Sequence, residues 1–144
     1  MKKIILPIVM ILSLMSSAYA RDDVGSYSIE SAMQTSKNQG VLTRGVKFYF
    51  GSQKHPKLTK NYVEIRTSKK TSAFGKTDAE SCEWAFLSAL KSFEARAVRE
   101  GGDAVINIKS NYKNNVTASN DRFQCGAGAF VSGVALIGEV VKLK

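Results

Sequence analysis

The chain has little of the chemistry that most catalytic and metal sites require. Its 144 residues include a single histidine, His55, and only two cysteines, Cys82 and Cys125. A histidine-based triad or dyad needs a nucleophile beside the imidazole, and His55 lies in a polar stretch before a proline with no such neighbour. One histidine and two cysteines that we expect to be bonded to each other do not make a zinc site. The sequence therefore predicts no metal and no cofactor.

A phosphate-binding loop is also missing, although the C-terminal stretch FQCGAGAFVSGVALIGEVVKLK is rich in glycine. Gly128 and Gly133 have the spacing of G-x-x-x-x-G, but Val134 and Ala135 follow where lysine and serine or threonine are required. The G-x-G-x-x-G pattern after Gly126 fails as well. We therefore expect no nucleotide ligand, and we interpret Gly126, Gly128 and Gly133 as structural positions where the strand bulges or another backbone approaches closely.

The sequence lacks a run of about 20 apolar residues, the length that spans a bilayer. Met1-Lys2-Lys3 is followed by the shorter apolar run 4–15, and then by small residues ending in Ala18-Tyr19-Ala20. This arrangement is typical of a secretory signal peptide at 1–20 that is cleaved between Ala20 and Arg21. It predicts a mature chain without a transmembrane segment, periplasmic or secreted, and the short basic start suggests a bacterial source.

Positive charge exceeds negative charge. The formal net charge is +9, so loss of Lys2 and Lys3 with the signal peptide leaves +7. A basic exported protein is attracted to anionic surfaces such as lipopolysaccharide, teichoic acid or extracellular nucleic acid. Scattered lysines also serve simple solubility, and aromatic residues do not alternate with them as in a platform for stacked bases.

The two cysteines both lie in the exported part of the chain. In an oxidising compartment an intramolecular disulfide is the default for such a pair, and two free buried thiols or an intermolecular bond are the alternatives. Glu139 is a further candidate residue, because it interrupts an apolar run. It either faces solvent on the polar side of a strand or is a buried carboxylate with a perturbed pKa.

The clearest secondary structure is a helix at 78–100. Thr77 and Glu80 match a capping box, the segment contains neither glycine nor proline, and Gly101 and Gly102 follow it. Alternation and β-favouring residues predict strands near 46–50, 62–68, 103–109 and 122–142. We expect the last of these to be one long bent strand or two short ones kinked near Gly133, and 21–44 to be a polar lead with one short helix or a flexible course.

The stretches EARAVREGGDAVINI and FQCGAGAFVSGVALIGEVV resemble two bacterial families. They are similar to the YbjQ-like small α/β domain and to the C-terminal domain of RcsF, an outer-membrane stress-sensing lipoprotein. Exported proteins labelled as excinuclease ATPase subunits share the layout, although this chain has neither an ATP-binding loop nor zinc cysteines. The YbjQ-like resemblance implies a small α/β fold and a possible homo-oligomer, and the RcsF-like resemblance implies a role in the cell envelope.

These observations predict an α/β (α+β) domain at 45–144, in which one long helix packs on a small mixed or antiparallel sheet. A disulfide between Cys82 and Cys125 would tie the helix to the last strand, with the strand glycines letting the helix lie close. The expected function is a non-enzymatic binding or interaction module of the envelope, with an envelope protein or an anionic surface polymer as partner. The alternative is a secreted hydrolase or effector that acts on anionic polymers.

Overall fold

The structure is a computed structural model that describes residues 21–144. The predicted signal peptide, with Ala20, lies outside the described residues. Within the described part, seven strands and two helices follow in the order β1 (Asp23–Ser28), α1 (Ile29–Gln39), β2 (Lys47–Phe50), β3 (Leu58–Ser72), α2 (Asp78–Glu100), β4 (Ala104–Tyr112), β5 (Asn115–Thr117), β6 (Arg122–Ala127) and β7 (Val131–Leu143).

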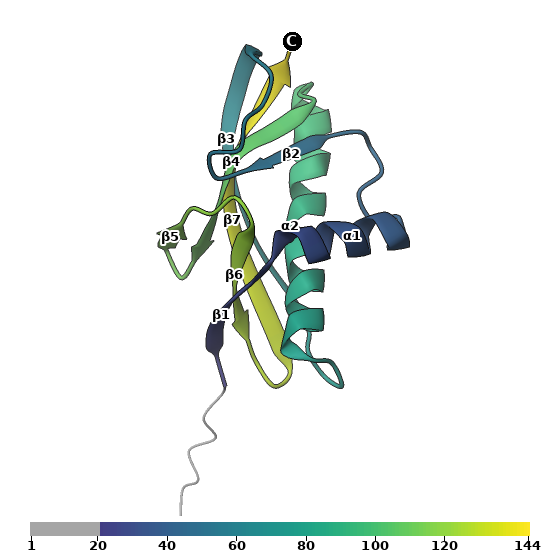
Figure 1. Cartoon of the computed structure of the whole chain (residues 1–144), viewed down its shortest axis with the longest axis vertical. Coiled ribbons are helices and arrows are strands. Elements are labelled where there is room, and N and C mark those ends of the chain that lie inside the picture. The colour runs from purple at the N-terminus through teal and green to yellow at the C-terminus, as the bar shows by residue number, and fades with distance from the viewer. Residues whose placement is uncertain (1–20) are drawn as a thin grey trace, which may run out of the picture.

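The strands form one curled mixed sheet in which β7 is central (Figure 1). β3 pairs with β7 in antiparallel fashion, from Leu58 opposite Leu143 to Ser72 opposite Val131. The other edge of β7 is shared, because β6 pairs with its first residues and β4 pairs with its second half. β1 pairs antiparallel with β6, β2 parallel with β4, and β5 forms a hairpin with the end of β4.

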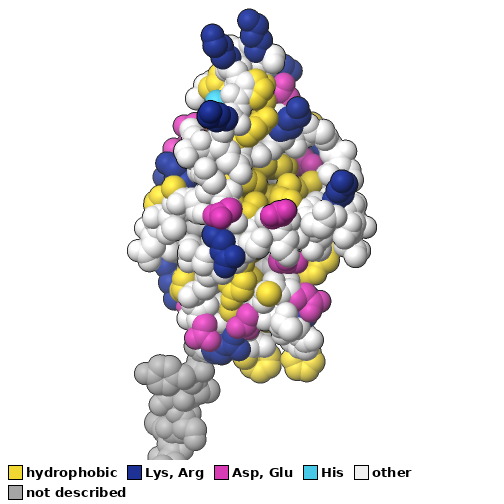
Figure 2. Space-filling model, in the orientation of Figure 1, with side chains coloured by type: hydrophobic (Ala, Val, Ile, Leu, Met, Phe, Trp, Pro, Cys, Tyr) yellow, Lys and Arg dark blue, Asp and Glu magenta, His cyan; other side chains and the backbone are white. Residues whose placement is uncertain are grey.

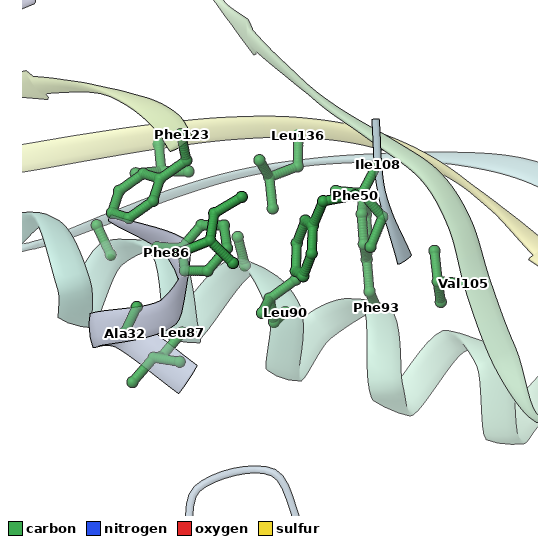
Figure 3. Packing of buried hydrophobic residues seen from close by; sticks show 14 of the residues in the cluster. Ala32, Phe50, Phe86, Leu87, Leu90, Phe93, Val105, Ile108, Phe123 and Leu136 are labelled. Atoms are coloured by element: carbon green, nitrogen blue, oxygen red, sulfur yellow. The ribbon is translucent and has the colours of Figure 1, made fainter. Parts of the chain in front are cut away.

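Helix α2 covers one face of this sheet and supplies much of the core. Figure 3 shows Phe86 and Phe93 of α2 pointing towards the strands. The ring of Phe86 stacks on Phe123 of β6 with 4.1 Å between the ring centroids, and both rings are buried. Gly138 of β7 lies beneath Phe93, where an added Cβ would be 3.2 Å from the ring. Removing these aromatic surfaces from water is the main force that holds helix to sheet.

The bounds of α2 agree with the predicted helix at 78–100, and local contacts explain both ends. The Thr77 hydroxyl accepts a hydrogen bond of 3.1 Å from the Glu80 amide, as the capping box predicts. At the other end Gly101 has φ +84°, a left-handed conformation that glycine adopts without strain. Gly102 then lies so close to β7 that an added Cβ would be 2.6 Å from Cγ1 of Val140.

The predicted fold class, one long helix on a small sheet, is wrong. Strands make up 45% of the described chain and two helices 27%, and the sheet has seven strands where we expected about four. The difference has a physical cause, because most of the additional pairing is non-local. β3 continues to both sides of the predicted 62–68 since β7 offers a partner along its whole length. β1 is likewise a strand because it pairs with β6, far along the chain, whereas the β4–β5 hairpin is a local pairing across the turn at Lys113 and Asn114.

The segment 21–44, expected as a polar lead, contributes β1 and α1. Ser28 accepts from the Ser31 amide at the start of α1, and Ile29 and Ala32 are buried in the main core. The predicted last strand at 122–142 is two strands, β6 and β7, but the chain reverses between them at 128–130 rather than at Gly133. A hairpin at that point lets β6 and β7 pair with each other.

Candidate functional site

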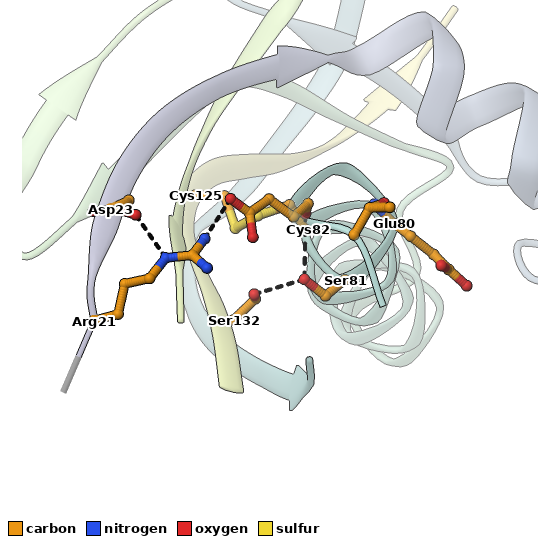
Figure 4. A network of polar contacts seen from close by, with 9 residues as sticks. Arg21, Asp23, Glu80, Ser81, Cys82, Cys125 and Ser132 are labelled. Atoms are coloured by element: carbon orange, nitrogen blue, oxygen red, sulfur yellow. Dashed lines mark hydrogen bonds and ion pairs between the residues drawn. A yellow bond between two sulfur atoms is a disulfide. The ribbon is translucent and has the colours of Figure 1, made fainter. Parts of the chain in front are cut away.

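The two cysteines form the predicted intramolecular disulfide. It joins Cys82, near the start of α2, to Cys125 of β6, with a Cα–Cα distance of 5.9 Å, and both residues are fully buried. Figure 4 shows the bond next to a buried hydrogen bond of 2.7 Å between the hydroxyls of Ser81 and Ser132. The disulfide is therefore a link between helix and sheet within the core, as predicted.

Arg21, the residue predicted to follow the cleavage site, is the first described residue. Its Nε donates to Asp23 at 2.6 Å, and its guanidinium also forms an ion pair with Asp78 at the start of α2 (Figure 4). These contacts join the first residues of β1 to the same end of the molecule as the first turn of α2.

The glycines of the last stretch make room for a tyrosine ring. Gly126 and Gly133 are paired across β6 and β7, and both face Tyr112 of β4. A Cβ added at Gly126 would lie 1.9 Å from the Tyr112 hydroxyl oxygen, which no side chain tolerates, whereas at Gly133 the nearest ring atom would be 3.6 Å away. Gly128 is confined by the Val131 carbonyl oxygen, 2.3 Å from an added Cβ. Helix α2 approaches Gly138 instead.

Tyr112 belongs to a small polar cluster on this side of the sheet. Its hydroxyl donates to the Asp22 carboxylate at 2.7 Å, and the ammonium of Lys113 donates to the other oxygen of the same carboxylate. The bond from Lys113, followed by that from Tyr112, lowers the pKa of Asp22 below its usual value. Burial of the phenol and the bond to Asp22 raise the pKa of Tyr112 to about 12. At neutral pH the cluster therefore holds a charged carboxylate between a cation and a neutral phenol.

A hollow of about 360 Å³ lies between β3 and the β4–β5 hairpin, and we take it as the candidate functional site. Its lining residues are mostly hydrogen-bonding or cationic and include no carboxylate: Arg66, Thr67, Ser68, Asn111, Lys113, Asn114, Ala135 and Leu136. Arg66 reaches it from β3, and Lys113 and Asn114 from the hairpin turn. The arrangement can offer donors to an anionic group and mixed donors and acceptors to hydroxyl groups.

The hairpin turn that forms one wall has an unusual backbone. Lys113 and Asn114 have φ of 51° and 62°, and the flanking Tyr112 and Asn115 pair with each other. Positive φ at both positions is the geometry of the tight two-residue hairpins that match the twist of a sheet. Asparagine enters that conformation readily, but it is uncommon for lysine. The turn directs the Lys113 ammonium back over the sheet to Asp22.

The two cations of the hollow remain accessible. Arg66 forms an ion pair with Glu64, two residues earlier on β3, at 3.2 Å, and Lys113 pairs with Asp22. The side chains of Arg66 and Lys113 are nevertheless 64% and 62% exposed, so donors of both groups still face water. This site was not predicted from the sequence. The Asn-rich stretch NYKNN is nevertheless a turn signal, from which the hairpin that forms one wall is predictable.

The remaining candidate residues lie outside this hollow. Nδ1 of His55 is 2.8 Å from the Pro56 carbonyl oxygen, and its ring meets Tyr49 edge-on. Glu139 is partly buried, and its carboxylate accepts a hydrogen bond of 2.8 Å from the side-chain amide of Asn107. Within residues 21–144, no three His, Cys, Asp or Glu side chains come together as a metal-binding group. In the same range no helix has the length and apolar character needed to cross a bilayer.

Comparisons with protein-family models, with curated proteins and with solved structures give no match. The resemblance to YbjQ-like domains and to RcsF therefore stays a prediction.

Proposed function

We propose that the protein is an exported, non-enzymatic binding module of the bacterial envelope, periplasmic or secreted, whose ligand is an anionic polymer rich in hydroxyl groups. The observation that carries the proposal is the hollow between β3 and the β4–β5 hairpin, whose lining includes two cationic residues, two asparagines, a serine and a threonine, and no carboxylate. Ala135 and Leu136 are the apolar residues of the lining.

Each kind of lining group fits one part of such a polymer. A guanidinium such as that of Arg66 binds a sulfate, phosphate or carboxylate group through parallel N–H donors, and the Lys113 ammonium adds a second positive charge. The amides of Asn111 and Asn114 both donate and accept, as do sugar hydroxyls. The net charge, +9 for the whole chain and +7 without Lys2 and Lys3, attracts polyanions over a longer range and speeds encounter with them.

The ligand must compete with the two existing ion pairs. Glu64 and Asp22 already neutralise part of the charge of Arg66 and Lys113. Exposed pairs of this kind are weak, since each contributes at most about 1 kcal/mol. An anion that brings several charges to both cations at once displaces them, whereas a single small anion gains little. The site therefore favours a polymer over a monovalent ion.

The test is binding to dextran sulfate and to unsulfated dextran of the same length, at physiological salt. We expect binding to the sulfated polymer. The double variant Arg66→Gln/Lys113→Gln should lose roughly tenfold or more in affinity, because it removes two charge-assisted contacts with the polymer. The matched control Arg99→Gln/Lys37→Gln removes two exposed charges elsewhere and should change affinity by less than about twofold.

Two outcomes would contradict the proposal. If the wild-type protein binds neither polymer, the hollow is not a polyanion site. If the two double variants lose affinity equally, the attraction arises from net charge and not from these residues. The unfolding midpoint of each variant should be measured as well, to separate loss of binding from loss of fold.

A further inference from the structure

Two phenylalanine side chains protrude into solvent at one end of the molecule. Phe74, in the loop between β3 and α2, is 75% exposed, and Phe130, in the turn between β6 and β7, is 70% exposed. Their rings are stacked, with 6.5 Å between centroids and planes 7° apart. Figure 2 shows exposed hydrophobic side chains gathered at the lower end of the molecule, opposite the end where Figure 1 marks the C-terminus. We call Phe74 and Phe130 the aromatic tip.

The two loops of the aromatic tip are held together by the fold. The Ala73 amide donates to the Phe130 carbonyl at 2.8 Å, and Ala73 itself is buried. Directly behind the loops lie the buried hydrogen bond between Ser81 and Ser132 and the disulfide of Cys82. The rings are therefore presented on a braced support, and they remain outside the core although burial of aromatic surface is favourable.

The size of the aromatic tip restricts what covers it. An aromatic side chain buries roughly 150–250 Å² when it is fully enclosed, so the exposed parts of the two rings offer about 200–350 Å². A stable protein interface buries at least about 1,000 Å² in total. The tip is too small and too narrow for such an interface. It suits insertion between lipid head groups, where a few protruding apolar side chains suffice and a flat partner surface is unnecessary.

The charges near the aromatic tip are mixed. Lys76 is exposed in the Phe74 loop itself, and Lys69 and Lys70 are exposed further along β3, opposite Val134 and Gly133. Asp23 and Asp78 share the single guanidinium of Arg21, and Glu80 is a further exposed carboxylate in the first turn of α2. The attraction to anionic lipid therefore comes from Lys76 together with the positive net charge of the whole chain. Lysines beside apolar protrusions favour anionic lipid surfaces.

The first described residue, Arg21, lies at the same end of the molecule as the aromatic tip. The Arg21 carbonyl oxygen lies 3.1 Å from where a Cβ of Gly128 would be, in the turn that carries Phe130. We propose that the aromatic tip inserts into the surface of an anionic phospholipid bilayer, so that the protein sits on a membrane with its polymer-binding hollow on a different surface.

The test uses protein exported by expressing cells and purified with its disulfide intact, its N-terminus defined by mass spectrometry. Co-sedimentation is measured with vesicles of phosphatidylethanolamine and phosphatidylglycerol, and with vesicles of phosphatidylcholine. We expect preferential binding to the anionic vesicles, and a loss of roughly tenfold or more in the partition coefficient for Phe74→Ser/Phe130→Ser. The control Val116→Ser changes an apolar residue that is 59% exposed on β5, and should bind as the wild type does.

Three results would contradict the proposal that the aromatic tip inserts into a bilayer. Failure of the wild type to bind either vesicle, or unchanged binding of the double phenylalanine variant, would overturn the proposal. A dimer of the wild type that the double variant abolishes, without vesicle binding, would assign the aromatic tip to self-association instead. The double variant should bind dextran sulfate like the wild type, so failure of the polymer proposal and failure of the membrane proposal are separable.

Discussion

The contact between Gly126 and Tyr112 makes the sharpest prediction about stability. Replacing Gly126 with alanine would place a methyl carbon 1.9 Å from the Tyr112 hydroxyl oxygen and 2.2 Å from Cζ. Neither distance is tolerable, so the Tyr112 ring has to move. We expect the Tyr112 side chain to turn away, which breaks its hydrogen bond of 2.7 Å to the Asp22 carboxylate.

Three effects set the magnitude. A hydrogen bond to a charged group contributes about 1.5–3 kcal/mol. Overpacking of a fitted site costs about 1–3 kcal/mol, an estimate that overlaps with the first because the same movement relieves the clash. Replacing glycine with alanine also restricts the unfolded chain, which favours folding by about 0.4–1 kcal/mol. The variant should therefore lose roughly 1–3 kcal/mol of its free energy of unfolding, measured by urea denaturation.

The matched control is Gly133→Ala, because Gly133 is the cross-strand partner of Gly126. Its Cβ would meet Cε2 of Tyr112 and Cγ of Lys70 at 3.6 Å, which is ordinary van der Waals contact. We expect this variant to unfold within about 0.5 kcal/mol of the wild type, as most mild substitutions do.

A second readout follows Tyr112 directly. The ultraviolet absorbance of tyrosinate should show one tyrosine that titrates with a pKa of about 12 in the wild type. In Gly126→Ala this pKa should move towards the ordinary value of 10.0, since the phenol leaves both its buried position and Asp22. The reasoning fails if the two alanine variants are equally stable, or if Gly126→Ala leaves the titration unchanged.

Three further predictions concern the disulfide, the helix end and alkaline pH. The double variant Cys82→Ala/Cys125→Ala should lose roughly 4 kcal/mol of unfolding free energy in urea, because the bond closes a loop with a sequence separation of 43; a loss below about 1 kcal/mol would contradict this. Gly102→Ala should lower the thermal midpoint, since its Cβ would lie 2.6 Å from Cγ1 of Val140, and an unchanged midpoint would show that β7 yields there. The pKa of Tyr112 is higher in the folded state, so the stability that its neutral form contributes is present below pH 10 and should be lost as pH rises from 10 to 12, a loss that Tyr112→Phe should remove.

Elements with strong local signals were predictable from the sequence. Helix α2 begins after Thr77 and ends at Gly101 because the capping hydroxyl and the left-handed glycine act within one turn of the helix ends. The pairing of Cys82 with Cys125 was also predictable, because the chain offers no other partner for either thiol. Alternation located the centres of β2, β3 and β4, although it did not locate their ends.

The features that depend on distant segments were decided only by the tertiary structure. β1 is a strand because β6 lies beside it. Glycine is required at position 126 because the side chain of Tyr112, from another strand, occupies the space that a Cβ would need. The hollow that includes Arg66 and Lys113 exists because β3 and the β4–β5 hairpin flank β7 at the same height. Capping and periodicity act between residues a few positions apart, and the sequence determines them by itself. Strand partners, close approaches and binding surfaces depend on the free energy of contacts between segments far apart in the chain. No local sequence pattern encodes those contacts.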